Sequence, residues 1–174
     1  MIMRQVIVLP YQSEWASEYE READRLREVF GVRLKQIHHM GSTSIPELAA
    51  KPIIDILPVV DTLEGIEQFD EPMEALGYEA KGEFGMPGRR YYRKGGDVRT
   101  HHIHLYATGN PEIKRHLVFR DYLRKHPEEA TAYGALKKQL AATYPLDIEA
   151  YIAGKDAFVK ELEHRAIAWG NTHD

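Results

Sequence analysis

The chain has 174 residues, a formal net charge of −4 at pH 7 and 43% hydrophobic residues. This length and composition are typical of one soluble globular domain with a substantial core. The charge balance argues against a general nucleic-acid binder, which usually presents a basic face. Because the sequence has no cysteine, disulfides, thiolate metal sites and cysteine nucleophiles are excluded.

The N-terminal residues 1–10 predict an edge strand that ends at Pro10, and they are too short for a signal peptide. No apolar stretch approaches the roughly 18 residues of a transmembrane helix. We therefore expect a cytoplasmic protein that does not contact membranes. Residues 13–30 carry apolar side chains at helical spacing, which predicts a helix that begins at Ser13 and ends at Gly31.

A predicted strand at residues 35–40 leads into a Gly-Ser turn. Gly41 allows the backbone to turn sharply and to approach a ligand closely. The hydroxyls of Ser42 and Ser44, together with free backbone N–H groups at the start of a helical turn, suit a phosphate. His39 precedes the turn, and we interpret it either as a substrate contact or as a hydrogen-bonded support of the turn.

The apolar run at residues 53–60 predicts a buried strand, and Asp55 lies inside it. A carboxylate among β-branched residues is costly to bury without a partner. Leu57 and Val59 share the face of Asp55, because side chains alternate along a strand. Two interpretations follow: Asp55 caps a core strand, or it is held at the mouth of a site opposite the Gly-Ser turn.

Residues 61–76 predict a helix, residues 78–80 a short strand, and residues 81–90 a flexible loop that contains three glycines. Such loops often act as lids beside a binding site. Arg90 and the neighbouring arginines could hold an anionic substrate. The alternative is a solvated basic loop without a ligand.

Residues 89–95 and 98–106 predict a β-hairpin. His102 and His104 share one face of its second strand. Two histidines at this spacing can bind a transition metal or contact a phosphate. Asp55 on a neighbouring strand is the obvious third ligand for such a metal.

From Asn110 onward the pattern predicts helices that end near Trp169 and are followed by a polar tail. Arg120 and Arg124 align on one helix face with His116, since residues four apart are neighbours on a helix. Planar guanidinium groups suit a phosphate. The alternative is that these arginines pair with acidic residues of the helices.

The order of these motifs resembles the GrpB-like family of the nucleotidyltransferase (DNA polymerase β-like) superfamily, over nearly the whole chain. The matching segments are Leu9-Pro10-Tyr11 with Trp15, His39 to Ser44, Ala50 to Asp55, His102 to Leu105, Phe119 to Arg124, Tyr133 with Lys137, and Tyr151 with Lys155. The resemblance implies a single domain over residues 1–170 and a polar tail at 171–174. The implied fold is α+β, with a small mixed β-sheet, flanking helices and a helical C-terminal half.

The resemblance also implies a metal-dependent nucleotidyltransferase, which transfers a nucleoside monophosphate to a small molecule or a protein hydroxyl. Asp55 would hold Mg²⁺ or Mn²⁺ with help from His102 or His104, and Lys51 would act at the catalytic centre. The expected partner is a small-molecule or nucleotide substrate rather than an extended nucleic acid. The residues expected to bind the nucleoside triphosphate are Gly41, Ser42, Ser44, Arg120, Arg124, Lys137 and Lys155.

One position departs from the superfamily pattern. Members carry a second acid two residues after the first, and Leu57 occupies that position here. A single carboxylate is a sparse ligand set for the two-metal arrangement that favours phosphoryl transfer. Two alternatives to an active transferase follow: a catalytically inactive nucleotide- or anion-binding module, and a metal-dependent hydrolase that uses His102, His104 and Asp55.

Overall fold

A mixed five-stranded β-sheet forms the centre of the structure, a computed structural model that describes residues 5–172. The strand order is β1-β2-β5-β4-β3, in which β2 and β5 are parallel and the other neighbours are antiparallel. The strands are β1 Leu34–Met40, β2 Ile54–Val60, β3 Tyr78–Ala80, β4 Arg89–Lys94 and β5 His101–Ala107. This sheet with its flanking helices confirms the expected α+β class.

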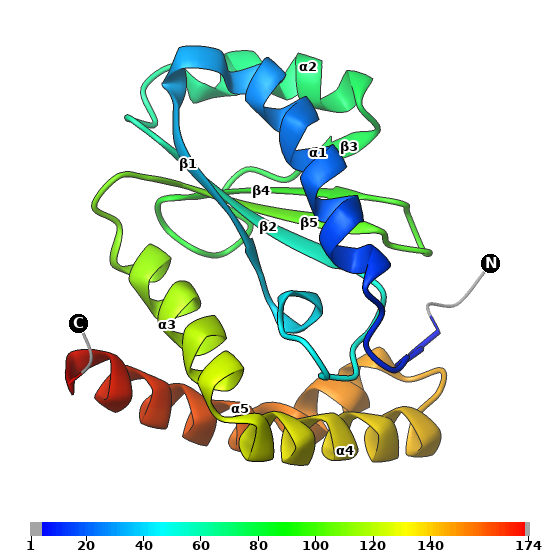
Figure 1. Cartoon of the computed structure of the whole chain (residues 1–174). Coiled ribbons are helices and arrows are strands. Elements are labelled where there is room, and N and C mark those ends of the chain that lie inside the picture. The colour runs from blue at the N-terminus through cyan, green and yellow to red at the C-terminus, as the bar shows by residue number, and fades with distance from the viewer. Residues whose placement is uncertain (1–4, 173–174) are drawn as a thin grey trace.

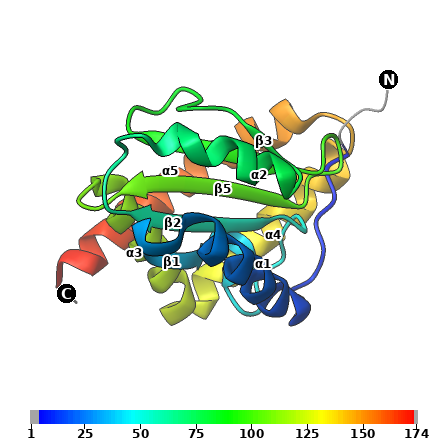
Figure 2. The ribbon, with the colours of Figure 1, turned by 90° about the horizontal axis from the view of Figure 1, so that it is seen from above.

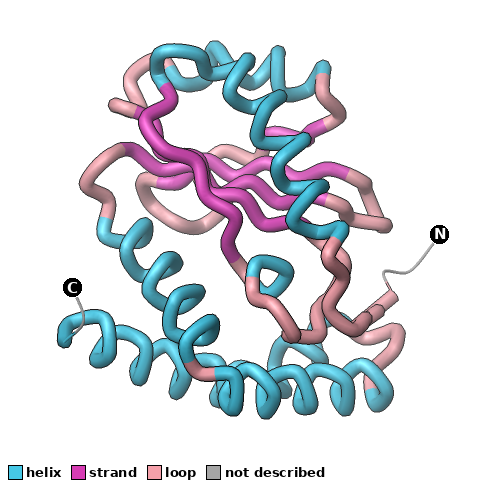
Figure 3. Tube along the Cα trace, viewed as in Figure 1, coloured by secondary structure: helices cyan, strands magenta, loops and turns pink. Residues whose placement is uncertain are grey.

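Helices lie on both sides of the sheet (Figure 1, Figure 2). Two of them, α1 and α2, lie on one side, and α3, α4 and α5 lie on the other. The α-helices are α1 Glu14–Phe30, α2 Asp70–Ala75, α3 Pro111–Lys125, α4 Pro127–Thr143 and α5 Ile148–Thr172. Three short 3₁₀ segments are η1 Gly31–Arg33, η2 Ser42–Ser44 and η3 Ile66–Phe69. Figure 3 shows η2 as one isolated turn in the loop between β1 and β2.

The alternation of side chains along β2 divides the core into two layers. Ile54, Ile56 and Val60 pack on the side of α1. Leu57 and Val59 belong to a cluster on the opposite side of the sheet. Asp55 shares the parity of Leu57, so its carboxylate is directed toward the side that α3, α4 and α5 cover.

The helix α1 carries the apolar stripe that its sequence predicts. Its buried residues recur at helical spacing, and the large ones face the sheet. They are Trp15, Tyr19, Glu22, Ala23, Leu26 and Phe30. Glu22 is the exception in this stripe, because it is a charged side chain that is 1% exposed.

A network of hydrogen bonds compensates for the burial of Glu22. Its Oε1 accepts hydrogen bonds from Tyr78 Oη at 2.7 Å and from Lys94 Nζ at 2.8 Å, and its Oε2 accepts one from Arg25 at 2.8 Å. Burial alone would raise the pKa of Glu22, but the hydrogen bonds from Lys94, Tyr78 and Arg25 together lower it to about 2. The network ties α1 to β3 and β4.

Several element boundaries differ from the sequence-based expectations. Within the described residues the predicted N-terminal edge strand is wrong: Leu9 makes a single bridge to Ala50, and Val6 N–H bonds to the carbonyl of Pro145 instead of a strand. Residues 1–4 of that prediction lie outside the described part. The helix predicted from residue 61 begins only at residue 66, because Arg33 holds the carbonyls of residues 62 and 64 in a loop.

A further difference concerns the C-terminus. The polar tail expected after residue 170 is still helical at residues 171 and 172, because α5 continues to Thr172. Residues 173–174 lie outside the described part. Among the helices of residues 5–172, none combines the length and hydropathy that a membrane crossing requires.

The buried Glu22 network yields a stability prediction. We expect Glu22→Gln to lower the free energy of unfolding at pH 7 by about 2 kcal/mol, because charge-assisted hydrogen bonds from Lys94 and Arg25 are lost. Glu20→Gln, on the exposed face of the same helix, should change it by less than about 0.5 kcal/mol. Urea unfolding measures both.

The same network predicts a pH dependence. The folded pKa of Glu22 lies below its ordinary value of 4.5, so its stabilisation is complete above pH 4.5 and is lost as the pH falls toward about 2. The difference in stability between the parent and Glu22→Gln should therefore shrink over that range. An unchanged difference at low pH would contradict this account.

Candidate functional site

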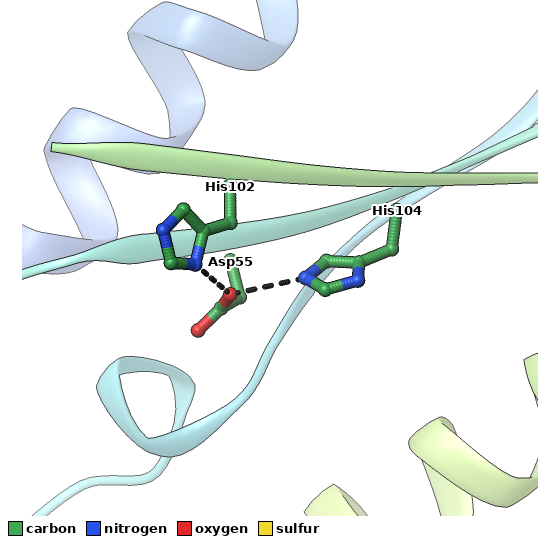
Figure 4. Close-up of side chains that lie close together, drawn as sticks. All are labelled: Asp55, His102 and His104. Carbon is green, nitrogen blue, oxygen red and sulfur yellow. Dashed lines mark hydrogen bonds and ion pairs between the residues drawn. The ribbon is translucent and has the colours of Figure 1, made fainter. Parts of the chain in front are cut away.

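Asp55 is the centre of a polar cluster on the side of the sheet that α3, α4 and α5 cover (Figure 4). In β2 it is paired with Met40 of β1 and with His102 of the parallel strand β5. Its Oδ1 lies 3.5 Å from His102 Nδ1 and 3.2 Å from His104 Nε2. The prediction that Asp55 and these histidines meet on one face is confirmed.

The two imidazoles keep Asp55 ionised. Burial alone would raise the pKa of the Asp55 carboxyl group, but the contacts with His102 and His104 outweigh burial and hold it well below its usual range. The carboxylate is thus available as a hard oxygen ligand at neutral pH. Tyr91 of β4 flanks both imidazoles, with ring centres 5.7 Å from His102 and 5.4 Å from His104.

These three side chains fit a divalent cation. One ligand atom from each of Asp55, His102 and His104 lies within 4.8 Å of the others. Within the described residues, His102 Nε2 and His104 Nδ1 are buried and have no hydrogen-bond partner. These are the ring nitrogens that face away from Asp55; His102 Nδ1 and His104 Nε2 are the nitrogens that contact its Oδ1, and they are the ones that could ligate a cation together with the carboxylate.

Gly41 allows the Gly-Ser turn to close against the carboxylate. Its backbone has φ 72°, which favours glycine, and a Cβ at this position would lie 2.6 Å from Asp55 Oδ2. The turn is held by Ser44, whose hydroxyl donates to the carbonyl of Gly41. From the sequence, we expected Gly41 to let the backbone approach a ligand. The structure shows that the absence of a side chain at Gly41 makes room for the Asp55 carboxylate.

A cavity of about 140 Å³ opens beside Asp55, between the Gly-Ser turn, the beginning of β2, and the helices α4 and α5. It joins residues that are far apart in the sequence. Its polar lining consists of Ser42, Thr43, Lys51, Asp55, His102, Lys137, Tyr151 and Lys155. The cavity therefore collects four predicted site residues that do not belong to the Asp55 cluster: Ser42, Lys51, Lys137 and Lys155.

Lys137 is the most deeply buried of the lysines, at 2% exposure. Its Nζ donates to Ser42 Oγ and, at 3.1 Å, to the carbonyl of Ala49, and it lies 4.3 Å from the centre of the Tyr133 ring. Burial lowers its pKa well below the ordinary value, and the charges of Lys155 and Lys51 lower it further. An anion in the cavity would oppose all of these effects and favour the protonated form.

Lys155 and Lys51 approach the cavity over aromatic rings. Lys155 Nζ lies 6.0 Å from the ring centre of Tyr133 and 5.4 Å from that of Tyr151. Lys51 Nζ lies 5.3 Å from the Tyr151 ring centre. Burial also lowers the pKa of Lys155. The tyrosine faces offset part of the cost of bringing these ammonium groups together.

Two arginines of α3, Arg120 and Arg124, support the turn from outside the cavity. Arg120 Nη1 donates to the carbonyl of His39 at 3.1 Å, and its Nε contacts Asp121. Arg124 donates through Nε and Nη2 to the carbonyl of Ser44, at 3.0 and 2.8 Å. These contacts fix the backbone on both sides of Gly41, and neither arginine lines the cavity. Their predicted contact with phosphate stays a prediction.

His39 is placed away from the cluster. It is paired with Ile56, on the side of the sheet opposite Asp55, and its ring stacks on Tyr19 of α1 with centres 4.7 Å apart. Its Nε2 bonds to Thr43 Oγ1 at 2.9 Å, and burial lowers its pKa to about 4. These are the contacts of a residue that supports the turn, the second of the two interpretations from the sequence.

Arg90 is also held outside the cluster. Its guanidinium pairs with Glu67 at 3.0 Å and bonds to the backbone carbonyl of Arg89. The side chains that the sequence analysis did not assign to the site are Tyr91, Tyr133 and Tyr151. Tyr133 and Tyr151 each stand four residues before a lysine, Lys137 or Lys155, and this helical spacing is the signal that could have placed their rings beside the ammonium groups.

Leu57 is fully buried rather than directed into the cavity. It is 0% exposed and belongs to a cluster with Met40, Val59 and Tyr106. The position at which the resemblance predicts a second acid is thus occupied by a core side chain, and β5 contributes imidazoles near Asp55.

The close fit of Gly41 yields a prediction with a matched control. Gly41→Ala should displace the Asp55 carboxylate and lower the free energy of unfolding by about 2 kcal/mol more than Gly31→Ala does. Gly31 also has a positive φ, 54°, but a Cβ there meets nothing within 4 Å, so the control carries the backbone strain alone. Equal losses in urea unfolding would rule out the contact with Asp55.

The burial of Leu57 yields a second prediction. Leu57→Asp should lower the free energy of unfolding by about 3 kcal/mol or more, because an unpaired carboxylate replaces a packed side chain. Leu57→Met, which conserves volume, should cost less than about 1.5 kcal/mol. Mn²⁺ should not restore the Asp variant in thermal unfolding; recovery with Mn²⁺ would mean that position 57 reaches the metal ligands.

Comparison with known proteins identifies the family. The chain matches the GrpB protein family over residues 5–165. It is 54% identical over 166 residues to UPF0157 protein YqkA of Bacillus subtilis (strain 168), an overlap of 95% of this chain and 48% of that protein. It is 33% identical over 163 residues to Glutamate-rich protein GrpB of Alkalihalophilus pseudofirmus, an overlap of 91% and 94%. The chain thus spans about half the length of YqkA.

Solved structures agree with this assignment. The crystal structure of conserved protein GrpB from Enterococcus faecalis is similar with a TM-score of 0.90 and 48% identity, covering 93% of this chain and 98% of that one. The Cid1 poly(U) polymerase with bound MgGTP is similar with a TM-score of 0.53 and 18% identity, covering 76% and 44%. The second likeness concerns the fold alone. The chain therefore belongs to the GrpB protein family and has the nucleotidyltransferase fold.

Proposed function

We propose that the protein is a divalent-metal-dependent nucleotidyltransferase, which transfers a nucleoside monophosphate to a hydroxyl of a small molecule or a protein. The observation that carries the proposal is that the Asp55 cluster and the lysine-lined cavity adjoin each other. Asp55 and His102 line a cavity that also presents Ser42, Lys137 and Lys155, and His104 contacts the same carboxylate. A cation site and an anion site are adjacent, as the phosphates of a metal–nucleotide complex require.

The cavity residues are assigned to the phosphate tail. Ser42 and backbone N–H groups of the Gly-Ser turn offer hydrogen bonds, while Lys137 and Lys155 provide charge. Lys51 lies on the same cavity, and we assign it to stabilising charge at the transferred phosphate. Enzymes of this type work mainly by positioning the substrate and by electrostatic stabilisation, so the proposal does not require a covalent enzyme intermediate.

The donor atoms decide which cation fits. Asp55, His102 and His104 would hold it, and imidazole nitrogen prefers first-row transition metals, whereas Mg²⁺ prefers oxygen. Mn²⁺ is therefore the better probe of this site than Mg²⁺. When bound, a divalent cation would neutralise phosphate charge and polarise a phosphoryl oxygen. The chain itself provides the orientation: Gly41 and the imidazoles hold the carboxylate in one place.

A second function is favoured by one specific observation. Leu57 is core, so the protein has one carboxylate where the superfamily pattern has two. A catalytically inactive module that binds a nucleotide or another anion accounts for this position without requiring turnover.

A hydrolase that uses the same three ligands differs only in its acceptor, which would be water. The expected small-molecule partner and cytoplasmic location accompany all three proposals.

The proposal is tested by metal binding and turnover in the same variants. With Mn²⁺ and nucleoside triphosphates, the parent should release pyrophosphate, and Asp55→Asn should lower this rate by about 100-fold or more. His104→Gln should weaken Mn²⁺ binding by roughly 10- to 100-fold. Matched controls are Asp61→Asn at the exposed end of β2 and His38→Gln on β1, both outside the cluster. Both should resemble the parent.

The products separate the alternatives. Free nucleoside monophosphate without an acceptor indicates hydrolysis, and a nucleotidylated small molecule or protein indicates transfer. Binding of nucleoside triphosphates without pyrophosphate release, in the parent and all variants, indicates the binding module. If neither Mn²⁺ nor a nucleotide binds to the parent in calorimetry, the proposed function is wrong.

A further inference from the structure

An exposed aromatic residue lies next to the Asp55 cluster. Phe84 belongs to the connection between β3 and β4, which curves beneath the sheet on the side of α3 (Figure 1), and it is 51% exposed. Its ring stacks on Tyr91, with centres 5.1 Å apart and planes at 17°. Tyr91 in turn flanks both His102 and His104. A continuous aromatic path thus leads from the metal ligands to an exposed ring.

The backbone holds Phe84 in this position at a cost. Phe84 has φ 48°, a conformation that bulky side chains rarely adopt and that persists where the surroundings enforce it. Arg89 enforces it by donating to the carbonyls of Phe84 at 2.8 Å and Glu83 at 3.2 Å. The carboxylate of Glu83 also accepts from Gly88 N–H at 2.7 Å. These hydrogen bonds within the glycine-rich loop hold the backbone of Phe84, whose ring is exposed.

Positive charge surrounds the two rings. Lys81 Nζ lies 5.4 Å and Arg93 Cζ 5.6 Å from the ring centre of Phe84, and Arg89 Cζ lies 5.0 Å from that of Tyr91. Lys81 and Arg93 share a single acid, Glu79, at 3.1 Å each. Tyr91 is buried beneath Phe84, so it is the exposed ring of Phe84 with these cations that suits a ligand both planar and anionic.

We infer that Phe84 is the stacking platform for the base of the nucleotide, in a site whose phosphate end is the lysine-lined cavity. The inference rests on the proposed function and assigns to it a residue that the motifs do not include. The chain of contacts supports it: Asp55 and His102 line the lysine cavity, Tyr91 contacts His102 and His104, and Phe84 stacks on Tyr91. This order matches the phosphate tail, the reacting phosphate and the base of a single nucleotide.

The chemistry also predicts the selectivity. Stacking on an aromatic ring tolerates every base, because each has a π-face. Phe84 offers a ring face and not a set of hydrogen bonds to base edges, so the site should accept purine and pyrimidine nucleotides with small differences in affinity. The cavity of about 140 Å³ encloses phosphates, and the base is held outside it.

The test compares ligands with and without a base. Calorimetry on the full chain would use the Mn²⁺ complexes of ATP, UTP and inorganic tripolyphosphate. Phe84→Leu, which keeps apolar bulk over Tyr91, should lower the affinity for ATP and UTP by about tenfold and leave the affinity for tripolyphosphate unchanged. Phe84→Trp should restore nucleotide affinity, and its added indole emission should be quenched by ATP but not by tripolyphosphate. Tyr144→Leu, an exposed aromatic at the end of α4, is the matched control and should bind like the parent.

Different failures have different meanings. If Phe84→Leu binds ATP and UTP like the parent while tripolyphosphate also binds, the inference is overturned and the proposed function stands. It is equally overturned if Phe84→Leu weakens tripolyphosphate as much as the nucleotides, since the substitution then acts on the cavity. If the parent binds none of these ligands, the proposed function fails and the platform fails with it.

Discussion

The half-buried carboxylate of Asp55 constrains much of this structure. Asp55 lies within the buried strand β2, where an ionised group requires partners. Both neighbouring strands contribute. His102 and His104 of β5 contact the carboxylate, and Gly41, which directly follows β1, has no side chain and so leaves room for it. A register shift of one residue would turn Asp55 into the apolar layer beneath α1. The site therefore fixes the register of the sheet as much as the sheet positions the site.

The lysine-lined cavity is explained by the same kind of argument. Ammonium groups are costly to bury and to bring together, and the lowered pKa values of Lys137 and Lys155 reflect that cost. Tyrosine rings and the carbonyl of Ala49 offset only part of it. Asp55 is the acid that lines the cavity, and it is already in contact with two imidazoles. A polyanion would satisfy what remains, which is why we assign the cavity to phosphates.

The sequence predicts this site unevenly, for physical reasons. Strand alternation places Asp55 and the two histidines on one face, and the structure confirms it, because the period of a strand determines the side of each residue. Helical spacing aligns Arg120 and Arg124 equally well, but it does not reveal what the shared face meets, and here it meets backbone carbonyls. Glu22 and Tyr91 follow the spacing of core residues, so their polar surroundings become visible only once the strands are assembled.

Under the proposed function, Leu57 at the position of the second acid of the superfamily pattern has a consequence for how metal and nucleotide bind. Neutral imidazoles contribute ligand atoms without negative charge, so Asp55 alone supplies the formal negative charge of the ligand set, where two carboxylates would supply twice as much. Electrostatic attraction for a free divalent cation is correspondingly weaker, and the neighbouring lysines oppose it. A nucleoside triphosphate would overcome the repulsion between the cation and the lysines, since its phosphates attract both. Under the proposed function, metal and nucleotide therefore bind as one complex, and the affinity for either alone underestimates the affinity for both.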